Sequence, residues 1–600
     1  MNILVFDCEV YPNYFLIAYK NIETNKTAYI ECVGKNTTLT KQDKNTLAYL
    51  FKNRILVGFN SDNYDLPIIM YAMNNATCDD IYNLSKSIID NNLKKWQTVK
   101  IHMISYLNNI NHIDLQNIVT TVRVSLKALG SRLNTEKLQD LPFNPTLELD
   151  SEQINIVRNY CLNDLNITKD VFNFVKKEYD IRKDLSKLYN VDLTNKSRAQ
   201  ISEQIIKHEL SKISYVTYNN QIKQEYCYKA PKNVIFHSKQ LQDLKELIEK
   251  SIFVLDNKGS LKLPKELSKI KIQINNTSYK VGIGGLHSQE KNIVYQSNED
   301  YIIIDKDVVS YYPSLIINLN YYPEHLGSNF LTIYKNLVEK RILAKKNKNE
   351  ILNNCLKIVI NGAFGKFGSK YSILYSPQLL LNITITGQLY LLMLIEMLEN
   401  NSNFEIISAN TDGIVCRINK NYEKNFINIV KEWEQITNLE TEGGVFSKYI
   451  ARDVNNYIAI RDNKIKCKGI FSILDLNIIE TLSKNLDKTI CIKAIIEYVK
   501  NKTSIEYTIK NCKDIKEFLV CRKASKGATY NGNYLGKQIR WVHIKEGKDL
   551  RCNETGNKIA GSNSCLPIMN LNEIPSNIYE LIDYDYYIDF CNKILLNLKI

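Results

Sequence analysis

Two short apolar runs that lie far apart in the chain both lead directly into carboxylates. Ile3 to Phe6 precedes Asp7 and Glu9, and Tyr301 to Ile304 precedes Asp307. Apolar runs of this length are typical of buried strands, and alternate side chains of a strand point to the same face. Because 600 residues exceed what one hydrophobic core supports, about three to five structural units are expected. We therefore expect a multi-domain protein with two separate acidic sites.

The composition is that of a globular protein with a positive net charge. Hydrophobic residues make up 44% and charged residues 24%, which leaves little room for a disordered tail. The net charge of +14 favours a polyanionic partner, because lysine and arginine release counterions when they neutralise phosphates. A coding bias toward lysine, asparagine and isoleucine explains the charge equally well. The charge alone therefore does not identify the partner.

The sequence indicates neither zinc binding nor secretion. Fourteen cysteines are scattered without a CxxC pair and form no ligand-spaced cluster with the seven histidines, which indicates reduced thiols. No basic region precedes the N-terminal apolar run, so no signal peptide is visible and a cytosolic location is expected. The uncharged stretch from Tyr371 to Ile395 is long enough to span a bilayer, but Pro377, Thr384 and Gln388 interrupt it. We interpret it as buried core, with no membrane partner.

The first acidic site combines residues from three elements. Asp7 and Glu9 share one strand face, where they could share a cation. Asp65 follows a second apolar run, and Tyr160 and Asp164 have the i, i+4 spacing of one helical face within a helix expected from about 151 to 176. Four carboxylates on two strands and a helix suit a two-metal hydrolysis, in which a tyrosine could orient the attacking water.

These elements resemble the three motifs of the proofreading 3′-5′ exonuclease of family B DNA polymerases, DxE, Nx(2-3)(F/Y)D and Yx3D. The resemblance implies that the four carboxylates are metal ligands and that Tyr160 orients the nucleophile. It also implies that Asn60 and Tyr64 contact the 3′ end of the primer. Lys137 is predicted to steady the scissile phosphate, and Lys127 competes with it for that role.

The second acidic site begins at Asp307, in the segment DVVSYYPS. This segment resembles motif A of family B polymerases, DxxSLYPS. Asp305 is a rival ligand by position, but the register of the motif's serine and proline selects Asp307. The resemblance implies that Tyr312 is the steric gate against a 2′-hydroxyl. It also implies that the backbone carbonyl of Val308 completes the metal site.

Two further segments resemble the remaining polymerase motifs. KIVINGAFG resembles motif B, Kx3NSxYG, and SANTDGI resembles motif C, YxDTDS, with Asp412 at the second aspartate. Asp307 and Asp412 would then hold two Mg²⁺ or Mn²⁺ ions that lower the pKa of the 3′-hydroxyl and neutralise pyrophosphate. Asn410 stands in place of the first aspartate, Gly413 in place of the motif C serine, and Gly362 in place of the motif B serine. The predicted nucleotide-binding residues are Arg341, Lys345, Lys357, Asn361 and Tyr312.

Weaker matches extend over most of the chain. TITGQ resembles the primer-template motif TxxGR, Gly284-Gly285 resembles the YxGG element, and NNY resembles KxY. Lysines and arginines interleaved with aromatic residues between 523 and 541 suit a thumb that grips the duplex backbone, or an ordinary basic surface. The predicted DNA-binding residues are Asn60, Tyr64, Thr384, Gly387, Tyr457, Lys537 and Arg540.

The fold class implied is α/β and α+β multi-domain, with a ribonuclease H-like exonuclease domain followed by a right-hand polymerase of palm, fingers and thumb. The predicted division is 1–185 exonuclease, 186–290 connecting region leading into the palm, 291–330 first part of the palm, 331–366 fingers, 367–470 second part of the palm, and 471–600 thumb and C-terminal region.

The implied function is DNA-directed DNA polymerase with proofreading, acting on primer-template DNA and deoxynucleoside triphosphates. Short spacings from Asp307 to Asn361 and on to Asp412 favour a compact phage-type replicative enzyme in the host cytoplasm. Accessory replication proteins are not indicated. One alternative is a stand-alone exonuclease whose degenerate polymerase domain only binds DNA. Another is a non-catalytic replication scaffold.

Overall fold

The computed structural model describes residues 3–107, 110–119, 124–213, 222–472, 481–482 and 487–600. The chain forms two compact units. The first consists of Met1–Asp180, Ile473–Tyr498 and Lys502–Cys591, and the second of Ile181–Ser472, Val499–Asn501 and Asn592–Ile600. The predicted exonuclease region and most of the predicted thumb therefore belong to one unit. The finer division into palm, fingers and thumb stays a prediction.

The N-terminal part of the first unit is built on a five-stranded mixed sheet in the order β3-β2-β1-β4-β5. β1 pairs antiparallel with β2 and parallel with β4, as expected for a strand that starts an α/β domain. The strands are β1 (Ile3–Tyr11), β2 (Tyr14–Asn21), β3 (Thr27–Val33), β4 (Ile55–Gly58) and β5 (His112–Asp114). The helices are α1 (Lys41–Asn53), α2 (Asp65–Met73), α3 (Cys78–Asp90), α4 (Lys95–Ile101), α5 (Leu115–Val119), α6 (Leu126–Arg132) and α7 (Ser151–Tyr189), and the residues of α7 after Asp180 belong to the second unit.

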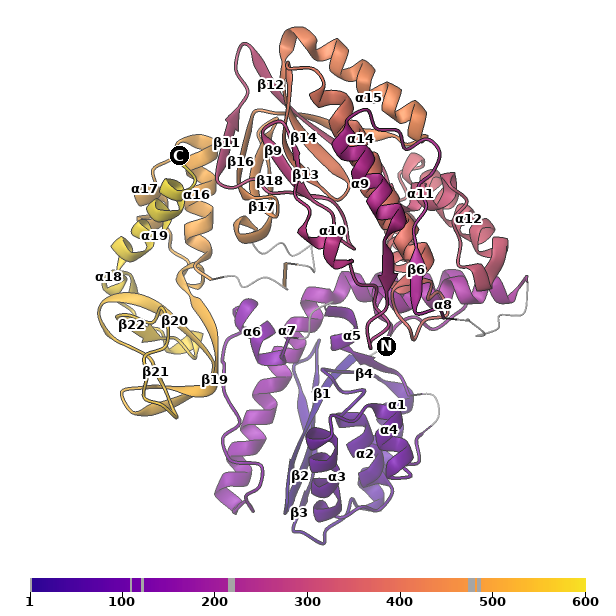
Figure 1. Ribbon diagram of the computed structural model, residues 1–600. Helices are drawn as coiled ribbons and strands as arrows, with labels where there is room; N and C mark the ends of the chain where they lie inside the picture. The colour runs from indigo at the N-terminus through magenta and orange to yellow at the C-terminus, as the bar shows by residue number, and fades with distance from the viewer. Residues whose placement is uncertain (1–2, 108–109, 120–123, 214–221, 473–480, 483–486) are drawn as a thin grey trace. The chain divides into compact units, whose positions relative to one another are not determined.

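The two faces of this sheet bury different cores, and β1 contributes to both. Phe6 and Cys8 pack with the residues of α1 to α3, whereas Val5 and Tyr11 pack with those of α5 to α7. The alternation confirms the predicted strand, and it places the odd-numbered side chains of β1 in the core that includes residues of α6 and α7. Figure 1 shows the ribbon of α7 on one side of this sheet and α1 to α3 on the other. Helix α7 begins where predicted, because the Asp150 side chain accepts a hydrogen bond from the backbone N–H of Gln153.

The C-terminal part of the first unit is a four-stranded sheet with helices beside it. The strand order is β21-β19-β20-β22. The elements are α16 (Thr489–Asn501), α17 (Ile505–Lys510), β19 (Val520–Tyr530), β20 (Asn533–Lys548), β21 (Arg551–Cys552), β22 (Cys565–Pro567), α18 (Ile578–Leu581) and α19 (Tyr584–Asn597), and the last residues of α16 and of α19 belong to the second unit.

Arg540 fastens β20 to the N-terminal part of the same unit, and this corrects its prediction as a DNA contact. Its side chain is 0% exposed. Its guanidinium donates to the carbonyls of Thr135 at 2.6 Å, Glu136 at 2.8 Å and Ile568 at 2.5 Å. Burial lowers the pKa of Arg540 to about 10. A guanidinium whose donors are used by buried carbonyls is structural and does not reach phosphates, whereas Lys537 on the same strand is exposed.

The second unit is organised around a seven-stranded sheet in the order β15-β12-β14-β13-β10-β9-β8. Its strands are β8 (Ile272–Ile274), β9 (Thr277–Lys280), β10 (His287–Ser288), β12 (Tyr301–Val308), β13 (Phe404–Asn410), β14 (Gly413–Asn419) and β15 (Thr441–Phe446). A four-stranded sheet consists of β11 (Ile293–Gln296), β16 (Lys448–Asp453), β17 (Asn456–Arg461) and β18 (Lys464–Cys467), and β6 (Glu225–Cys227) pairs with β7 (Ile252–Val254).

The glycine cluster from 282 to 285 lies between two strands that pair with each other, since His287 of β10 is opposite Lys280 of β9. The cluster is therefore a turn within one sheet and not a hinge between domains. The helices of this unit are α8 (Arg198–Ser211), α9 (Lys239–Lys250), α10 (Lys265–Lys269), α11 (Tyr311–Asn318), α12 (Gly327–Lys346), α13 (Glu350–Phe367), α14 (Pro377–Glu399) and α15 (Glu423–Thr437).

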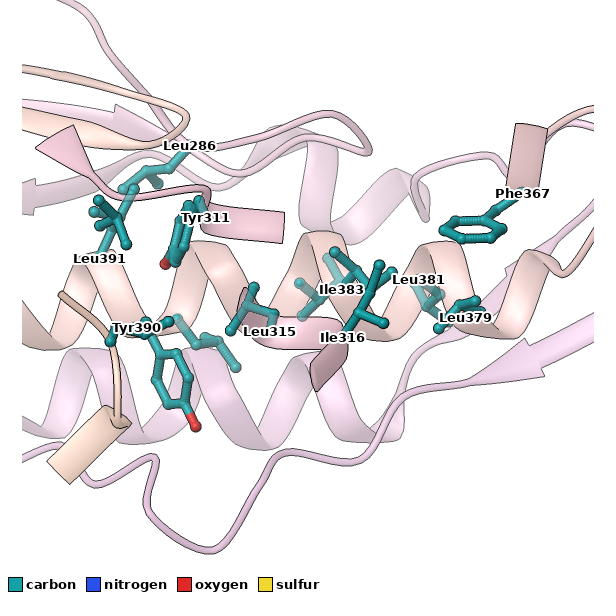
Figure 2. Close-up of a cluster of buried hydrophobic side chains, with 14 of the residues drawn as sticks. Leu286, Tyr311, Leu315, Ile316, Phe367, Leu379, Leu381, Ile383, Tyr390 and Leu391 are labelled. Atoms are coloured by element: carbon teal, nitrogen blue, oxygen red, sulfur yellow. The ribbon is translucent and has the colours of Figure 1, made fainter. Parts of the chain in front are cut away.

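Helix α14 is the central core helix of the second unit. Pro377 occupies its first turn, and the Ser376 side chain caps it by accepting from the backbone N–H of Leu379. Figure 2 shows Leu379, Ile383 and Leu391 of α14 in the same cluster as Tyr311 and other buried side chains. Among the described residues it is the one helix that is long and apolar enough to cross a membrane, and 83% of its apolar window is buried. This confirms the prediction of buried core.

Replacing Arg540 with methionine is expected to lower the free energy of unfolding by at least about 3 kcal/mol, because several buried carbonyls lose a charged donor. Urea denaturation measures the change. Lys537→Ala, an exposed position on the same strand, is the matched control and should leave the midpoint unchanged. Equal midpoints for Arg540→Met and the wild type would contradict a structural role.

Candidate active sites

The first site lies on the face of β1 that turns toward α6 and α7. Carboxylate oxygens of Asp7 and Glu9 and the Sγ atom of Cys161 lie within 4.8 Å of one another. Cys161 follows Tyr160 on α7, so the helix brings this thiol to the carboxylates. The sequence analysis missed Cys161, because a lone buried cysteine carries no spacing signal.

Asp65 joins these carboxylates through the loop between β4 and α2. Asp114 holds that loop by accepting hydrogen bonds from the backbone N–H groups of Asn60 at 2.8 Å and Asp62 at 3.1 Å. Gly58 is required at the loop's start, because a Cβ atom there would overlap the Ser61 side chain. Asp65 begins α2, and its Oδ1 accepts from the backbone N–H of Cys8 at 3.2 Å. The carboxylate of Asp65 is thereby tied to the strand that carries Asp7 and Glu9.

Lys127 enters the site from α6, whose first turn is capped by the Ser125 hydroxyl. Its Nζ pairs with the Asp164 carboxylate and lies 4.4 Å from the centroid of the Tyr160 ring. Tyr160 and Asp164 both contact Lys127 from one face of α7, as the i, i+4 spacing predicts. One cation, one phenol and the carboxylates thus meet at one place.

Burial and mutual repulsion act together on these acids. Burial, followed by repulsion from Asp65, Glu9 and Asp164, raises the pKa of Asp7 well above its ordinary value. Burial and then Asp164 raise the pKa of Glu9, and Lys127 opposes both shifts. Buried carboxylates that repel one another are stabilised by a cation, and oxygen ligands suit Mg²⁺ or Mn²⁺. The donor set therefore fits the metal that the sequence implies.

The structure brings one of the two candidate lysines to the carboxylates, and the contact of either with a scissile phosphate stays a prediction. Lys137, which we predicted for the scissile phosphate, is exposed, and its backbone pairs with Asn570. Lys127 contacts the carboxylates instead. The hydroxyl of Tyr64 hydrogen-bonds Ser85 at 2.7 Å, and Asn60 adopts a left-handed backbone conformation with φ 59°. Contact of Asn60 and Tyr64 with a 3′ end stays a prediction.

The second site lies where β12 and β14 pair. Asp307 is opposite Gly413, and a Cβ atom at Gly413 would overlap the Asp307 carboxylate. The backbone N–H of Val308 donates to the carbonyl of Asp412 at 2.7 Å. Glycine in place of the motif C serine therefore leaves room for the Asp307 carboxylate beside the turn that carries Asp412.

The turn from Asn410 to Asp412 rests on the glycine cluster. Thr411 has φ 47°, and its backbone N–H donates to the carbonyl of Leu286 at 2.9 Å. A Cβ atom at Gly285 would lie 2.9 Å from the Thr411 side chain, so glycine permits the close approach. The Asn410 Oδ1 accepts a hydrogen bond from the Thr411 hydroxyl at 3.1 Å. This neutral side chain thus stabilises the turn where the family has a carboxylate.

The structure distinguishes Asp307 from its rival. Asp305 is buried and paired with Arg461 at 2.9 Å, although burial and Asp307 together raise its pKa to about 6. Asp305 and Asp307 both line a cavity of about 170 Å³ together with Asn410 and Asp412, but Asp307 is the half-exposed one of the two. Burial and then Asp307 raise the pKa of Asp412, which is the effect of two carboxylates meeting in one cavity.

Lys466 is a site residue that the sequence analysis missed. Its Nζ lies 3.6 Å from Oδ2 of Asp307, and Lys466 and Tyr457 line the same cavity. Lys464, Lys466 and Lys468 alternate along and just after β18, so the period of two puts them on one face. That alternation was the available signal, and no motif marked it.

The predicted gate tyrosine is held by stacking. The ring of Tyr312 stacks on Phe364 of α13 with centroids 4.4 Å apart, and its hydroxyl donates to the carbonyl of Gly284 at 2.7 Å. On the same helix Lys357 and Asn361 are exposed, so motif B presents a cation, an amide and a ring from one face. Arg341 donates to Ser310 of motif A at 3.3 Å and to Asn353 at 3.2 Å, and Lys345 is exposed.

Thr384 and Gly387 are not retained as direct DNA contacts, because α14 buries them. Thr384 is 1% exposed and its hydroxyl donates to the carbonyl of Leu380. The carbonyl of Gly387 accepts from the buried Tyr311 hydroxyl at 2.5 Å, and Gln388 makes two hydrogen bonds with the backbone of Gly282. This segment holds motif A and the glycine cluster in place.

Lys127→Ala is expected to slow 3′-end degradation about a hundredfold, as the loss of one positioned cation does in other phosphate and oxyanion sites. The measurement is release of the terminal nucleotide from a labelled single strand in Mg²⁺. Lys137→Ala, with its exposed side chain, serves as the control and should remain within about twofold of the wild type. The reverse ranking would restore Lys137 to the role.

Gly362→Ser restores the family's motif B serine and is expected to destabilise the second unit by about 1 to 3 kcal/mol. A Cβ atom at Gly362 would overlap Ser202 of α8 and approach the carbonyl of Arg198 to 2.8 Å. Gly365→Ser on the same helix has open space around its Cβ and is the control. Thermal unfolding distinguishes the two variants. Equal melting temperatures would show that α8 moves aside without a loss of stability.

Neither the protein-family models nor the curated proteins include a match to this chain. Among solved structures, the family B DNA polymerase from the hyperthermophilic archaeon Pyrobaculum calidifontis is similar. The identity is 14%, the TM-score is 0.42, and the match covers 100% of this chain and 77% of that one. Identity and TM-score this low do not assign the chain to a family. We therefore infer function from the residues of the two sites.

Proposed function

We propose that this protein is a DNA-templated DNA polymerase with a 3′-5′ proofreading exonuclease. The observation that carries the proposal is the presence of two separate carboxylate sites, one in each compact unit. Asp7, Glu9, Asp65 and Asp164 form the first, and Asp307 and Asp412 meet in the second. Each is built from segments that match a family B motif, in the family's order along the chain.

In the polymerase site, Asp307, Asp412 and the Val308 carbonyl would hold Mg²⁺ or Mn²⁺, which lowers the pKa of the 3′-hydroxyl and neutralises the leaving pyrophosphate. The chain's own residues bind and orient. Lys357, Asn361, Arg341 and Lys345 bind the triphosphate, and Tyr312 on its Phe364 support excludes a 2′-hydroxyl. Tyr457 and the exposed Lys537 bind primer-template DNA.

In the exonuclease site, the four carboxylates would hold a pair of the same ions, which activate water and stabilise the leaving oxygen. Lys127 neutralises Asp164 and lies where it can meet the scissile phosphate. Tyr160 orients the attacking water. A compact phage-type replicative enzyme remains part of the proposal on the short motif spacings, and the similar solved protein is archaeal.

Primer extension with deoxynucleoside triphosphates and Mg²⁺ tests the proposal. Asp307→Asn should abolish extension and leave 3′-end degradation intact, because its site lies in the other unit. Asp7→Ala with Glu9→Ala should do the opposite, and loss of both activities in one variant would show that the sites are wrongly divided. If the wild type degrades single strands but never extends a primer, the protein is a stand-alone exonuclease. The neutral Asn410, which stands where motif C has an aspartate, is the observation that favours this alternative. Absence of both activities would favour the non-catalytic replication scaffold.

A further inference from the structure

The large, mostly apolar side chain of Trp96 lies largely in solvent. The chain has three tryptophans, and Trp433 and Trp541 are both 0% exposed, whereas Trp96 is 67% exposed. A large aromatic side chain left in water loses the stabilisation that burial would supply. Among the described residues of the first unit, none makes a hydrogen bond or a ring contact with the Trp96 indole, which directs attention to a ligand.

Helix α4, which carries Trp96, is attached to the loop of the exonuclease site. The backbone N–H of Lys95 donates to Oδ1 of Asn63 at 3.2 Å, and the Lys95 ammonium lies 3.6 Å from Asp62. The same loop ends at Asp65, whose carboxylate binds the Cys8 backbone. Trp96 is therefore one residue away from the anchor between α4 and the loop that positions a catalytic carboxylate.

The segment around Trp96 is basic, although Asp62 lies 3.6 Å from Lys95. Residues 91 to 113 contain three lysines, at 94, 95 and 100, and no aspartate or glutamate. Lys100 is exposed and stands four residues after Trp96, so the ring and an ammonium group share one face of α4. An exposed aromatic ring beside a cation fits a nucleic acid whose bases are unpaired, because bases of a duplex are hidden from stacking on a side chain.

We propose that Trp96 and Lys100 form a binding platform for single-stranded DNA, in which the indole stacks on a base and the ammonium binds the adjoining phosphate. The strand is the one whose 3′ end reaches Asp7, Glu9, Asp65 and Asp164, so the platform rests on the proposed exonuclease. Stacking on a ring is tolerant of sequence, as a proofreading substrate requires.

Fluorescence anisotropy of a labelled oligothymidylate, titrated with the full-length protein in EDTA to prevent degradation, tests the platform. Trp96→Ala should weaken binding roughly tenfold, and Trp96→Phe, which keeps a ring, should retain most of the affinity. Tyr49→Ala is the matched control, because Tyr49 is an exposed aromatic residue on α1 of the same unit. Binding of a blunt duplex should be unaffected by Trp96→Ala.

Intrinsic fluorescence supplies a second readout from the intact protein. Since Trp96 is the exposed tryptophan, iodide should quench it, and the oligonucleotide should protect it. Unchanged oligonucleotide affinity in Trp96→Ala, or equal losses for single strand and duplex, would overturn the proposal and leave the surface to a protein partner. Suppose that the wild type degrades 3′ ends and that Trp96→Ala degrades and binds single strands as well as the wild type does. The platform is then refuted and the proposed exonuclease stands. If the wild type degrades no 3′ ends, the proposed exonuclease is refuted. The affinity and quenching measurements then still show whether Trp96 binds single-stranded DNA.

Discussion

Repulsion between carboxylates that the fold forces together is the constraint on which both sites depend. Burial and neighbouring negative charge raise the pKa of Asp7, Glu9 and Asp412. Ordinary folding would separate such groups, since an unpaired buried charge is costly. Lysines instead offset part of the repulsion in each site, Lys127 in the first and Lys466 with Lys468 in the second. The remaining negative charge is of the kind that the divalent cations of the proposed function would neutralise.

Close approach of backbones is the second requirement, and glycine meets it at several positions. Gly413 leaves room for the Asp307 carboxylate, and Gly285 allows the turn that carries Thr411 to lie against the glycine cluster. Gly362 allows α8 to pack closely against α13. Two of these glycines replace residues that the family pattern expects. They are explained by neighbours in space, Asp307 and Ser202, and not by a change in the chemistry of the site.

The second unit also shows how a core helix can support a site without touching a substrate. Helix α14 is buried along most of its length, and it binds Tyr311 through Gly387 and the glycine cluster through Gln388. Tyr311 precedes Tyr312 in the chain, and the glycine cluster supports the turn that carries Asp412, so both contacts lie next to elements of the second site. Residues that resemble a primer-template motif therefore hold the walls of the site, and Gln388, which stands where that motif has arginine, does so through the backbone of Gly282.

Local periodicity was enough to determine which carboxylates share a face. The strand period placed Asp7 with Glu9, the helical period placed Tyr160 with Asp164, and the uncharged stretch around α14 indicated a buried core. Contacts between distant segments were decided only by the tertiary structure. It placed Lys127 and not Lys137 at the carboxylates, assigned Arg540 to buried carbonyls, and brought Lys466 to Asp307. The reason is physical: periodicity describes neighbours within one element, whereas the partner of a charge depends on how separate elements pack.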